Sequence, residues 1–199
     1  PKAHLPLIPR RGMQGVVPSA INLASWFGRG PHESYVDRSR GAWTALHQMP
    51  VANLFHGYTD PQESGNRSEV RWATLTPAGG GLGLRMDATG DSLLSFSAYP
   101  APQTEIELAR HRSDLSATKD QLWLNIDHRQ MGLGGTNSWG ELPLEKYRIP
   151  AQGSYQWSFM LTPQSIPVPA VRRPMPLPPG LVPEGPLPTP KPPELPGKN

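Results

Sequence analysis

The chain has 199 residues and a formal net charge of +3 at pH 7, with 36% hydrophobic and 18% charged residues. This fits one medium domain or a small domain with tails, and it excludes an acidic tail or a coiled coil. The absence of cysteine excludes a disulfide scaffold, a cysteine nucleophile and thiolate metal sites. No apolar run approaches the ~20 residues that cross a bilayer, so no membrane span is expected. No charged-then-apolar leader is visible either, and the compartment stays open.

The positive charges do not form a stripe along the first half of the chain. They are scattered between polar and apolar residues, at Arg29, Arg38, Arg40, Arg67, Arg71 and Arg85. A nucleic-acid-binding surface needs basic residues gathered on one face. Nucleic acid is therefore not expected as a partner.

Proline divides the chain into three parts. Residues 1–15 carry early prolines without periodicity and are expected to form an extended N-terminal arm. Fourteen of the 26 prolines follow Thr162, so residues 163–199 are expected to be a Pro-rich tail that neither joins a sheet nor forms a helix. The folded body is predicted to span 16–162.

Short runs with a period of two dominate this body, separated by Gly, Pro, Asn or Asp. Predicted strands cover 154–161, 69–76, 93–99 and 121–126, with weaker ones at 20–27 and 82–86. One helix of two or three turns is predicted at 106–115, and the glycines at 79–81 predict a turn. This pattern predicts an all-β fold, an antiparallel β-sandwich. Six to eight strands leave edges without partners, so we expect another segment or chain to supply part of the sheet.

The residues give little support for catalysis within this chain. A glycosidase needs two carboxyl groups ~5–9.5 Å apart, and no acidic residue stands in a distinctive pair. No G-x-S-x-G elbow exists, and no two of the six histidines have the H-x-H or H-x-x-x-H spacing of metal ligands. We therefore expect no catalytic residue, no metal ligand and no cofactor in this chain.

One segment, residues 122–140, differs from the rest. A predicted strand leads into a turn with Gly132, Gly134 and Gly135, which ends in Asn137-Ser138-Trp139. Glycines let the backbone take positive φ and approach a neighbour closely. An indole presented by such a loop offers a large apolar face with a donor at its rim, which suits the C–H face of a sugar. A core tryptophan beneath a turn is the alternative.

Three blocks in sequence order resemble the C-terminal domain of glycoside hydrolase family 2 β-galactosidases, which is sometimes encoded separately as the small chain. They are WFGRGPHESYVDR at 26–38, PQESGNR at 61–67, and LNID at 124–127 followed by MGLGGTNSW at 131–139. The match extends through the segment from Tyr147 to Phe159. It covers about 16–162, whereas the Pro-rich tail has no counterpart in the family.

The resemblance implies a fold and a division of labour. The fold would be the late part of a galactose-mutarotase-like supersandwich, with its early strands missing. The catalytic glutamates and metal ligands would belong to a separate (β/α)₈ barrel, while Trp139 would stack on the galactoside, with Asn137 and Ser138 as further substrate-binding residues. Thr136 stands where the family usually has an acidic residue. The residues expected to be structural are Glu33, Asp37, Arg38, Asn125 and Asp127, the first three in a buried turn.

Three functions stay open at this point. The first is the terminal domain of a β-galactosidase-type enzyme, active only with a catalytic barrel. The second is a non-catalytic structural subunit of a larger assembly, and the third is a lectin. In the tail, Arg173, Pro176 and Pro179 fit the +xxPxxP pattern of SH3-type ligands, with a simple linker as the alternative.

Overall fold

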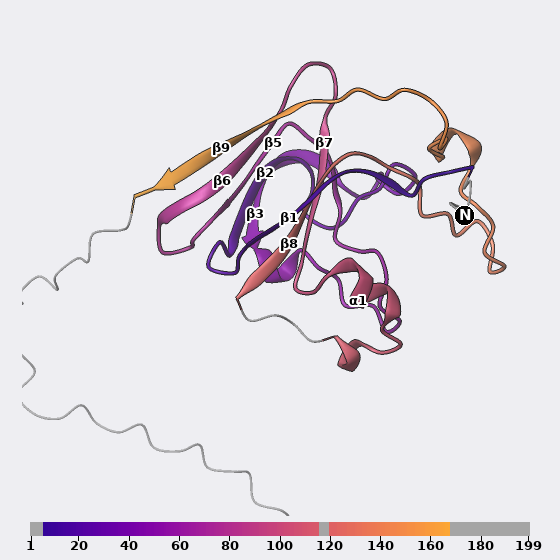
Figure 1. Ribbon diagram of the computed structural model, residues 1–199, viewed down its shortest axis with the longest axis horizontal. Coiled ribbons are helices and arrows are strands. Elements are labelled where there is room, and N and C mark those ends of the chain that lie inside the picture. Colours follow the sequence, from indigo (N-terminus) through magenta and orange to yellow (C-terminus); the bar gives the residue numbers. More distant parts are fainter. Residues whose placement is uncertain (1–5, 116–119, 168–199) are drawn as a thin grey trace, which may run out of the picture. The chain divides into compact units, whose positions relative to one another are not determined.

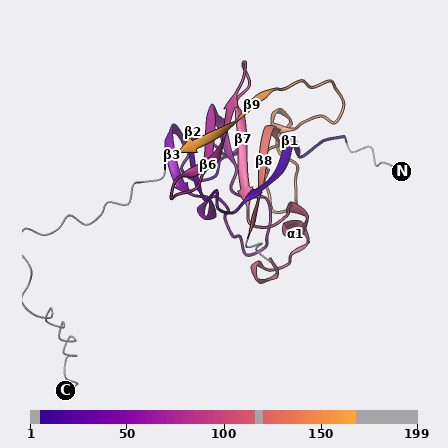
Figure 2. The same cartoon turned by 60° about the vertical axis from the view of Figure 1, so that its left-hand side comes forward.

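Two antiparallel sheets pack face to face in the computed structural model, which describes residues 6–115 and 120–167 (Figure 1). The four-stranded sheet has the order β1 (Arg10–Pro18), β8 (Gln121–Gln130), β7 (Leu94–Tyr99), β4 (Arg67–Val70). The five-stranded sheet has the order β3 (Trp43–Pro50), β2 (Leu23–Gly30), β5 (Trp72–Thr76), β6 (Gly81–Ala88), β9 (Phe159–Ile166). The two layers separate in Figure 2, where β2, β3 and β6 lie to one side of β1, β7 and β8. The predicted antiparallel β-sandwich is confirmed.

The alternating sequence pattern places one face of each sheet in the core. In β2, Ala24 and Trp26 are fully buried while their neighbours are only half-buried. The Trp26 ring meets the edge of Phe96 from β7 at 5.9 Å, which joins the two layers. Its indole N–H donates to the Arg29 carbonyl oxygen at 2.9 Å, so burial leaves no polar atom of this side chain unpaired.

The predicted strand at 69–76 is two strands in different sheets. β4 ends at Val70 and pairs with β7, whereas β5 begins at Trp72 and pairs with β2 and β6. The Arg71 N–H donates to the Phe27 carbonyl at the crossing point. Glu69 has a positive φ of 52°, which bends the chain where a regular strand would have continued.

The predicted strand at 154–161 is shifted along the chain, and this also corrects the expected start of the tail. β9 runs from Phe159 to Ile166 and pairs with β6, so its second half lies in the Pro-rich segment. Pro163 is tolerated there because β9 is an edge strand, where a missing N–H costs no ladder bond on the free side. Residues 154–158 form no strand and are exposed except for Trp157, which stacks against His128 of β8 and Phe159 of β9.

Two further strands differ from the sequence-based expectation. β1 begins at Arg10, inside the stretch expected to be an arm, and pairs with β8 along its whole length. β3 was not predicted, because its outward side, with Thr44, Leu46 and Gln48, mixes polar and apolar residues. The described residues thus form nine strands, more than the six to eight expected.

The predicted helix at 106–115 is shorter and lies earlier. α1 spans Gln103–Leu108 and a 3₁₀ turn, η2, spans Arg112–Asp114; two more 3₁₀ turns are η1 (Val51–Asn53) and η3 (Glu145–Tyr147). The Asp114 carboxylate accepts hydrogen bonds from the backbone N–H groups of Arg110 and His111 at 3.1 and 2.9 Å. This local bonding competes with helix continuation. None of the described helices is long and apolar enough to span a membrane.

Candidate functional site

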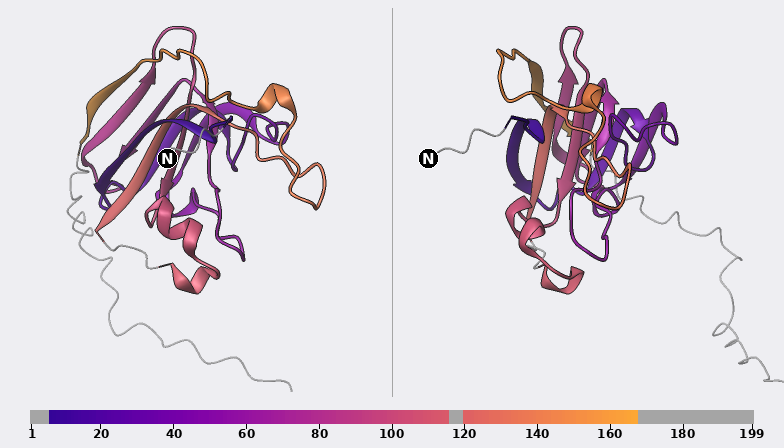
Figure 3. Two further views of the ribbon diagram at one scale, coloured as in Figure 1. Left: turned by 45° about the vertical axis from the view of Figure 1, so that its right-hand side comes forward. Right: turned by 90° about the vertical axis from the view of Figure 1, so that its right-hand side faces the viewer.

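The Gly-rich segment after β8 leaves the sandwich as an open loop. We call residues 131–144 the Trp139 loop. In Figure 3, this loop and the η3 turn that follows it project from the end of the sheets. The loop is closed at its base by the Gly132 N–H, which donates to the Tyr147 carbonyl oxygen at 2.9 Å. Beyond this base, residues 135–142 are exposed.

Asp37 anchors this loop from a distant part of the sequence. Its Oδ2 accepts the Gly134 N–H at 2.9 Å, across 97 positions of the chain. A Cβ on Gly132 would lie 2.6 Å from the same oxygen, and Gly134 has a φ of 78°. Both glycines are therefore required, one for close approach and one for backbone conformation. The other oxygen of Asp37 is buried and finds no hydrogen-bond partner among the described residues.

The tip of the loop is organised by Asn137 and Glu141. The Asn137 side-chain oxygen accepts the Trp139 N–H at 2.9 Å and the Glu141 N–H at 3.4 Å, while its amide nitrogen donates to Glu141 Oε2 at 2.8 Å. Thr136 also donates to Glu141 Oε2, at 3.4 Å. Glu141 thus brings a carboxylate close to Thr136, the position at which the resemblance implies an acidic residue. Asn137, predicted to bind substrate, uses its amide within the loop.

Trp139 projects from this organised tip with 91% of its surface exposed. The alternative of a core tryptophan beneath a turn is therefore wrong. Ser138 beside it is also exposed. None of the four cavities described for this chain is lined by residues 137–139. Among the described residues, the indole of Trp139 thus lies on an open surface.

Glu33 is the centre of a polar cluster in the segment that also carries Asp37. We call residues 33–38 together with 58–67 the Glu33 block. Glu33 Oε2 accepts the Gly65 N–H at 2.7 Å, and Oε1 accepts the Tyr58 hydroxyl at 2.6 Å and is ion-paired with Arg38. The bond to Glu33 and burial raise the pKa of the Tyr58 hydroxyl. The Arg38 side chain is 54% exposed, so the turn expected to be buried has one face open to solvent.

Arg67, the last residue of the second motif, is the buried cation of this block. It is 2% exposed, donates to the carbonyl oxygens of Gly65 and Leu54 at 2.8 and 3.4 Å, and lies over the Trp26 ring at 5.4 Å. Burial lowers its pKa to about 10. Because its partners are carbonyl groups and an aromatic face, the guanidinium ties the 54–65 segment to the core.

The two predicted structural residues of β8 are both buried and paired. Asn125 donates to Ser97 at 3.1 Å and accepts from Gln14 at 2.8 Å. Asp127 is 1% exposed and forms an ion pair with Arg10 at 2.9 Å. Burial raises the pKa of Asp127 to about 6, against the opposing effect of Arg10. Arg10 was assigned to the arm, so sequence reasoning did not identify this pair.

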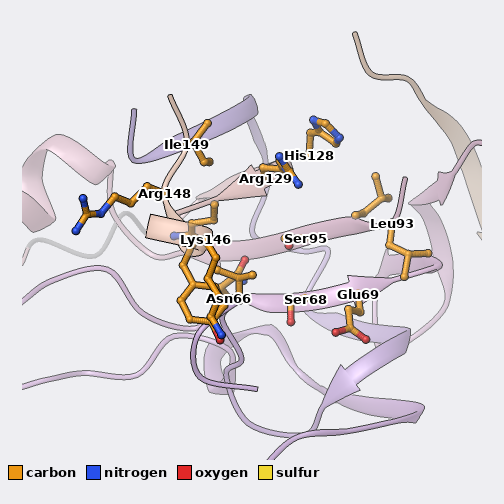
Figure 4. Close-up of a pocket in the computed structure, with 14 residues that line it drawn as sticks. Asn66, Ser68, Glu69, Leu93, Ser95, His128, Arg129, Lys146, Arg148 and Ile149 are labelled. Carbon is orange, nitrogen blue, oxygen red and sulfur yellow. The ribbon is translucent and has the colours of Figure 1, made fainter. Parts of the chain in front are cut away.

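A cavity of about 250 Å³ lies where β4, β7 and β8 meet η3 (Figure 4). Basic side chains gather around it, but the Arg148 side chain extends away from the other labelled residues in Figure 4. Its Nε donates to the Pro143 carbonyl, and Glu69 at the opposite side is paired with Arg29 at 2.7 Å. The basic residues therefore do not converge on one point as an anion site requires.

The remaining predicted features involve metals and the tail. Within residues 6–115 and 120–167 no three His, Asp or Glu side chains are grouped so as to hold a metal ion. The proposed SH3-type residues Arg173, Pro176 and Pro179 lie outside the described residues.

Comparison with known proteins agrees with the three motif blocks. The family model of the β-galactosidase small chain matches residues 2–161. The chain is 37% identical over 164 residues to a β-galactosidase of Priestia megaterium, covering 82% of this chain and 15% of the relative. It is 36% identical over 157 residues to a β-galactosidase of Lactobacillus delbrueckii subsp. bulgaricus, covering 79% and 15%, and 34% identical over 162 residues to that of Streptococcus thermophilus, covering 81% and 16%. It therefore spans about one sixth of the length of these relatives. The chain belongs to the β-galactosidase small-chain family.

Proposed function

We propose that this chain is the terminal β-sandwich of a β-galactosidase-type glycosidase and completes its galactoside site with Trp139. The bond-breaking glutamates would come from a separate catalytic barrel, which acts with retention of configuration through a nucleophile and an acid/base. The family membership and the short share of the relatives' length support this division. Galactoside binding, the barrel and the retained configuration are all parts of this proposal.

The observation that carries the proposal is the exposure of Trp139. An indole that is 91% exposed contributes almost nothing to the core of this chain. Nevertheless, Asp37, Asn137 and Glu141 hold the loop around it in a defined shape. A fixed aromatic surface loses little conformational entropy when it binds a ligand. Such an arrangement is expected of a residue that stacks on a ring supplied from outside.

The electrostatics of the neighbouring carboxylates favour a supporting role for this chain. Glu33 accepts bonds from Gly65 and Tyr58, and Asp127 is buried against Arg10. A retaining glycosidase needs two carboxyl groups that both face the sugar, one ionised and one protonated. Glu33 and Asp127 are instead directed at groups within the sandwich, and each is used to hold it together.

The test is complementation. The 199-residue chain, a β-galactosidase barrel of the same family without its terminal domain, and their mixture are assayed on a chromogenic β-galactoside. We expect hydrolysis only in the mixture, with net retention at the anomeric carbon by NMR. Hydrolysis by the chain alone would refute the division of labour. A mixture that forms a complex without gaining activity would favour the structural-subunit hypothesis instead.

The role of Trp139 is tested in the same mixture. Trp139→Ala should lower kcat/KM by about 10- to 100-fold, which corresponds to the loss of ~1.4 to 3 kcal/mol of stacking. Trp43→Ala is a matched control, because Trp43 is also exposed, at 62%, but lies on β3. Equal kinetics for the two variants would contradict the stacking role.

A further inference from the structure

A larger cavity lies beside the base of the Trp139 loop. Its volume is about 440 Å³, and residues of β1, the 61–63 segment, β7, α1 and 130–133 line it. This volume is within the range of small-molecule sites, ~300–1,000 Å³. We call it the Arg10 cavity. Trp139 is not among its lining residues, so it is distinct from the indole surface described above.

Arg10 lines this cavity, and three partners fix its side chain. Its guanidinium is paired with Asp127 at 2.9 Å and with Glu63 at 3.4 Å, and it donates to Gln103 Oε1 at 2.8 Å. These three partners come from β8, the 61–63 segment and α1, so the planar group is fixed from three directions. A group fixed in this way needs no reorganisation when a ligand arrives.

Glu63 is the fixed acceptor of the cavity. The Tyr99 hydroxyl donates to its Oε1 at 2.9 Å and the Tyr35 hydroxyl donates to the same oxygen at 3.4 Å. Its Oε2 faces Arg10 at the longer distance of 3.4 Å, and the side chain is 21% exposed. A carboxylate offers about four acceptor positions. Glu63 therefore keeps acceptor capacity toward the cavity.

Gln130 belongs to the same wall, and it also lines the 250 Å³ cavity beside η3. Its side-chain oxygen is buried and has no hydrogen-bond partner among the described residues. An unpaired buried polar atom is uncommon and calls for an explanation, since it costs ~1–3 kcal/mol. A ligand hydroxyl would remove this cost once the Gln130 side chain turns its buried oxygen toward the cavity.

Charge and shape narrow the class of ligand. The positive charge of Arg10 is already opposed by Asp127 and Glu63, and Glu107 adds a further carboxylate to the lining, so the cavity is not suited to an anion. Ile106, Met131 and Leu133 supply apolar wall between the polar groups. A ligand with several hydroxyls and C–H faces matches fixed acceptors and donors separated by apolar patches.

We propose that the Arg10 cavity binds a neutral pyranose sugar, as a carbohydrate subsite separate from Trp139. The sugar's hydroxyls would donate to Glu63 and, after its side chain turns, to Gln130, and its C–H groups would pack on Leu133 and Met131. The inference extends the proposed function and relies on it for the choice of galactosides as probes. Its own support is the cavity and the fixed polar groups.

The test is a titration of the full 199-residue chain, labelled with ¹⁵N, with methyl β-galactoside and with lactose. We expect saturable shifts of the Gln103, Gly132 and Leu133 backbone amides. Leu133→Trp should weaken this binding at least about tenfold by filling the cavity. Leu142→Trp is the matched control: it adds the same indole to the same loop at a position that does not line the cavity, and should bind as the parent chain does.

Gln130→Met gives a second variant in case Leu133→Trp disturbs folding. It removes the unpaired oxygen at similar volume, so we expect an unchanged or higher Tm together with weaker sugar binding. Saturation without shifts at the cavity amides would overturn the proposal, as would equal affinity in Leu133→Trp and Leu142→Trp.

Trp139→Ala separates this proposal from the proposed function. If Trp139→Ala abolishes all galactoside binding while Leu133→Trp changes nothing, the cavity subsite is wrong and the Trp139 role stands. If the cavity amides still titrate in Trp139→Ala and the barrel mixture gains no activity, the proposed function fails and the subsite stands.

Discussion

The Glu33 block and the Trp139 loop are adjacent in space but differ in how they are held. In the block, side chains from distant positions bond to each other and to buried backbone groups, as Glu33 does to Gly65 and Arg67 does to Leu54. In the loop, the side-chain hydrogen bonds at the tip join residues that are close in sequence. The base of the loop is held by Asp37, which lies in the connection between β2 and β3. The family motifs therefore include two kinds of residue: those whose side chains hold the sandwich together and those that are exposed on the Trp139 loop.

Arg67→Ala, in the Glu33 block, should lower stability far more than a change in the Trp139 loop does. It removes a buried guanidinium from two carbonyl oxygens and from the Trp26 ring and leaves a cavity. We expect the free energy of unfolding to fall by about 4 kcal/mol. Chemical denaturation measures this, and Arg40→Ala, at an exposed position, is the control. A loss below about 1 kcal/mol would show that the block tolerates its removal.

Asp127, in β8, should make the stability of the sandwich depend on pH. Its pKa is about 6 in the folded chain and 3.8 for an unperturbed group. Because the folded chain binds this proton at higher pH than the unfolded chain, the contribution of Asp127 to stability increases as pH falls from 7 to 4 and is lost as pH rises through 6. The shift corresponds to ~2 to 3 kcal/mol.

The measurement compares the parent chain with Asp127→Asn, which cannot titrate at this position. We expect the parent to gain stability relative to Asp127→Asn between pH 7 and pH 4, by denaturant melts at fixed ionic strength. The opposite slope would mean that the ion pair with Arg10 outweighs the burial of the carboxylate.

Asp37→Ala should loosen the Trp139 loop more than it destabilises the sandwich. It leaves the Gly134 N–H without its acceptor, so we expect a stability loss of about 1 kcal/mol. Amide exchange at Gly134 should be faster by about 10-fold or less, because 1.4 kcal/mol corresponds to a factor of ten. Asp37→Asn retains an acceptor oxygen and should preserve most of the protection. Unchanged exchange in Asp37→Ala would show that the loop is held by other contacts.

The sequence was informative wherever periodicity and local turns decide the structure. The strands β2, β5, β7 and β8 overlap predicted strands. In β2 and β5 the buried residues largely alternate with half-buried ones, whereas β7 and the middle of β8 contain continuous buried runs. The crossing at Arg71 and the shift of β9 were not predictable, because which sheet a strand joins depends on long-range pairing. For the same reason, Arg10 could not be paired with Asp127 from sequence.

The candidate site, too, was predictable where a local pattern decides the structure and not where long-range contacts do. The Gly-rich loop was expected from the residue types, whereas the presentation of its tryptophan to a ligand was expected only from the family resemblance. The anchoring of the loop by Asp37 and the Arg10 cavity depend on residues about 30 to 120 positions apart, which no local pattern connects. One signal was present in the residue types, because an acidic residue in a buried strand, as Asp127 is in β8, requires a partner for its carboxylate.

Trp139→Ala should have the smallest effect on stability, although it removes one of the largest side chains. The indole is 91% exposed, so its removal creates no cavity and exposes little new apolar surface. We expect the free energy of unfolding to change by no more than about 0.5 kcal/mol, whereas Trp26→Ala in the core should lose about 3 to 5 kcal/mol. Denaturant melts of the two variants measure the difference directly. A large loss in Trp139→Ala would mean that the indole packs against this chain in solution, and its place as a surface offered to a ligand would then be untenable.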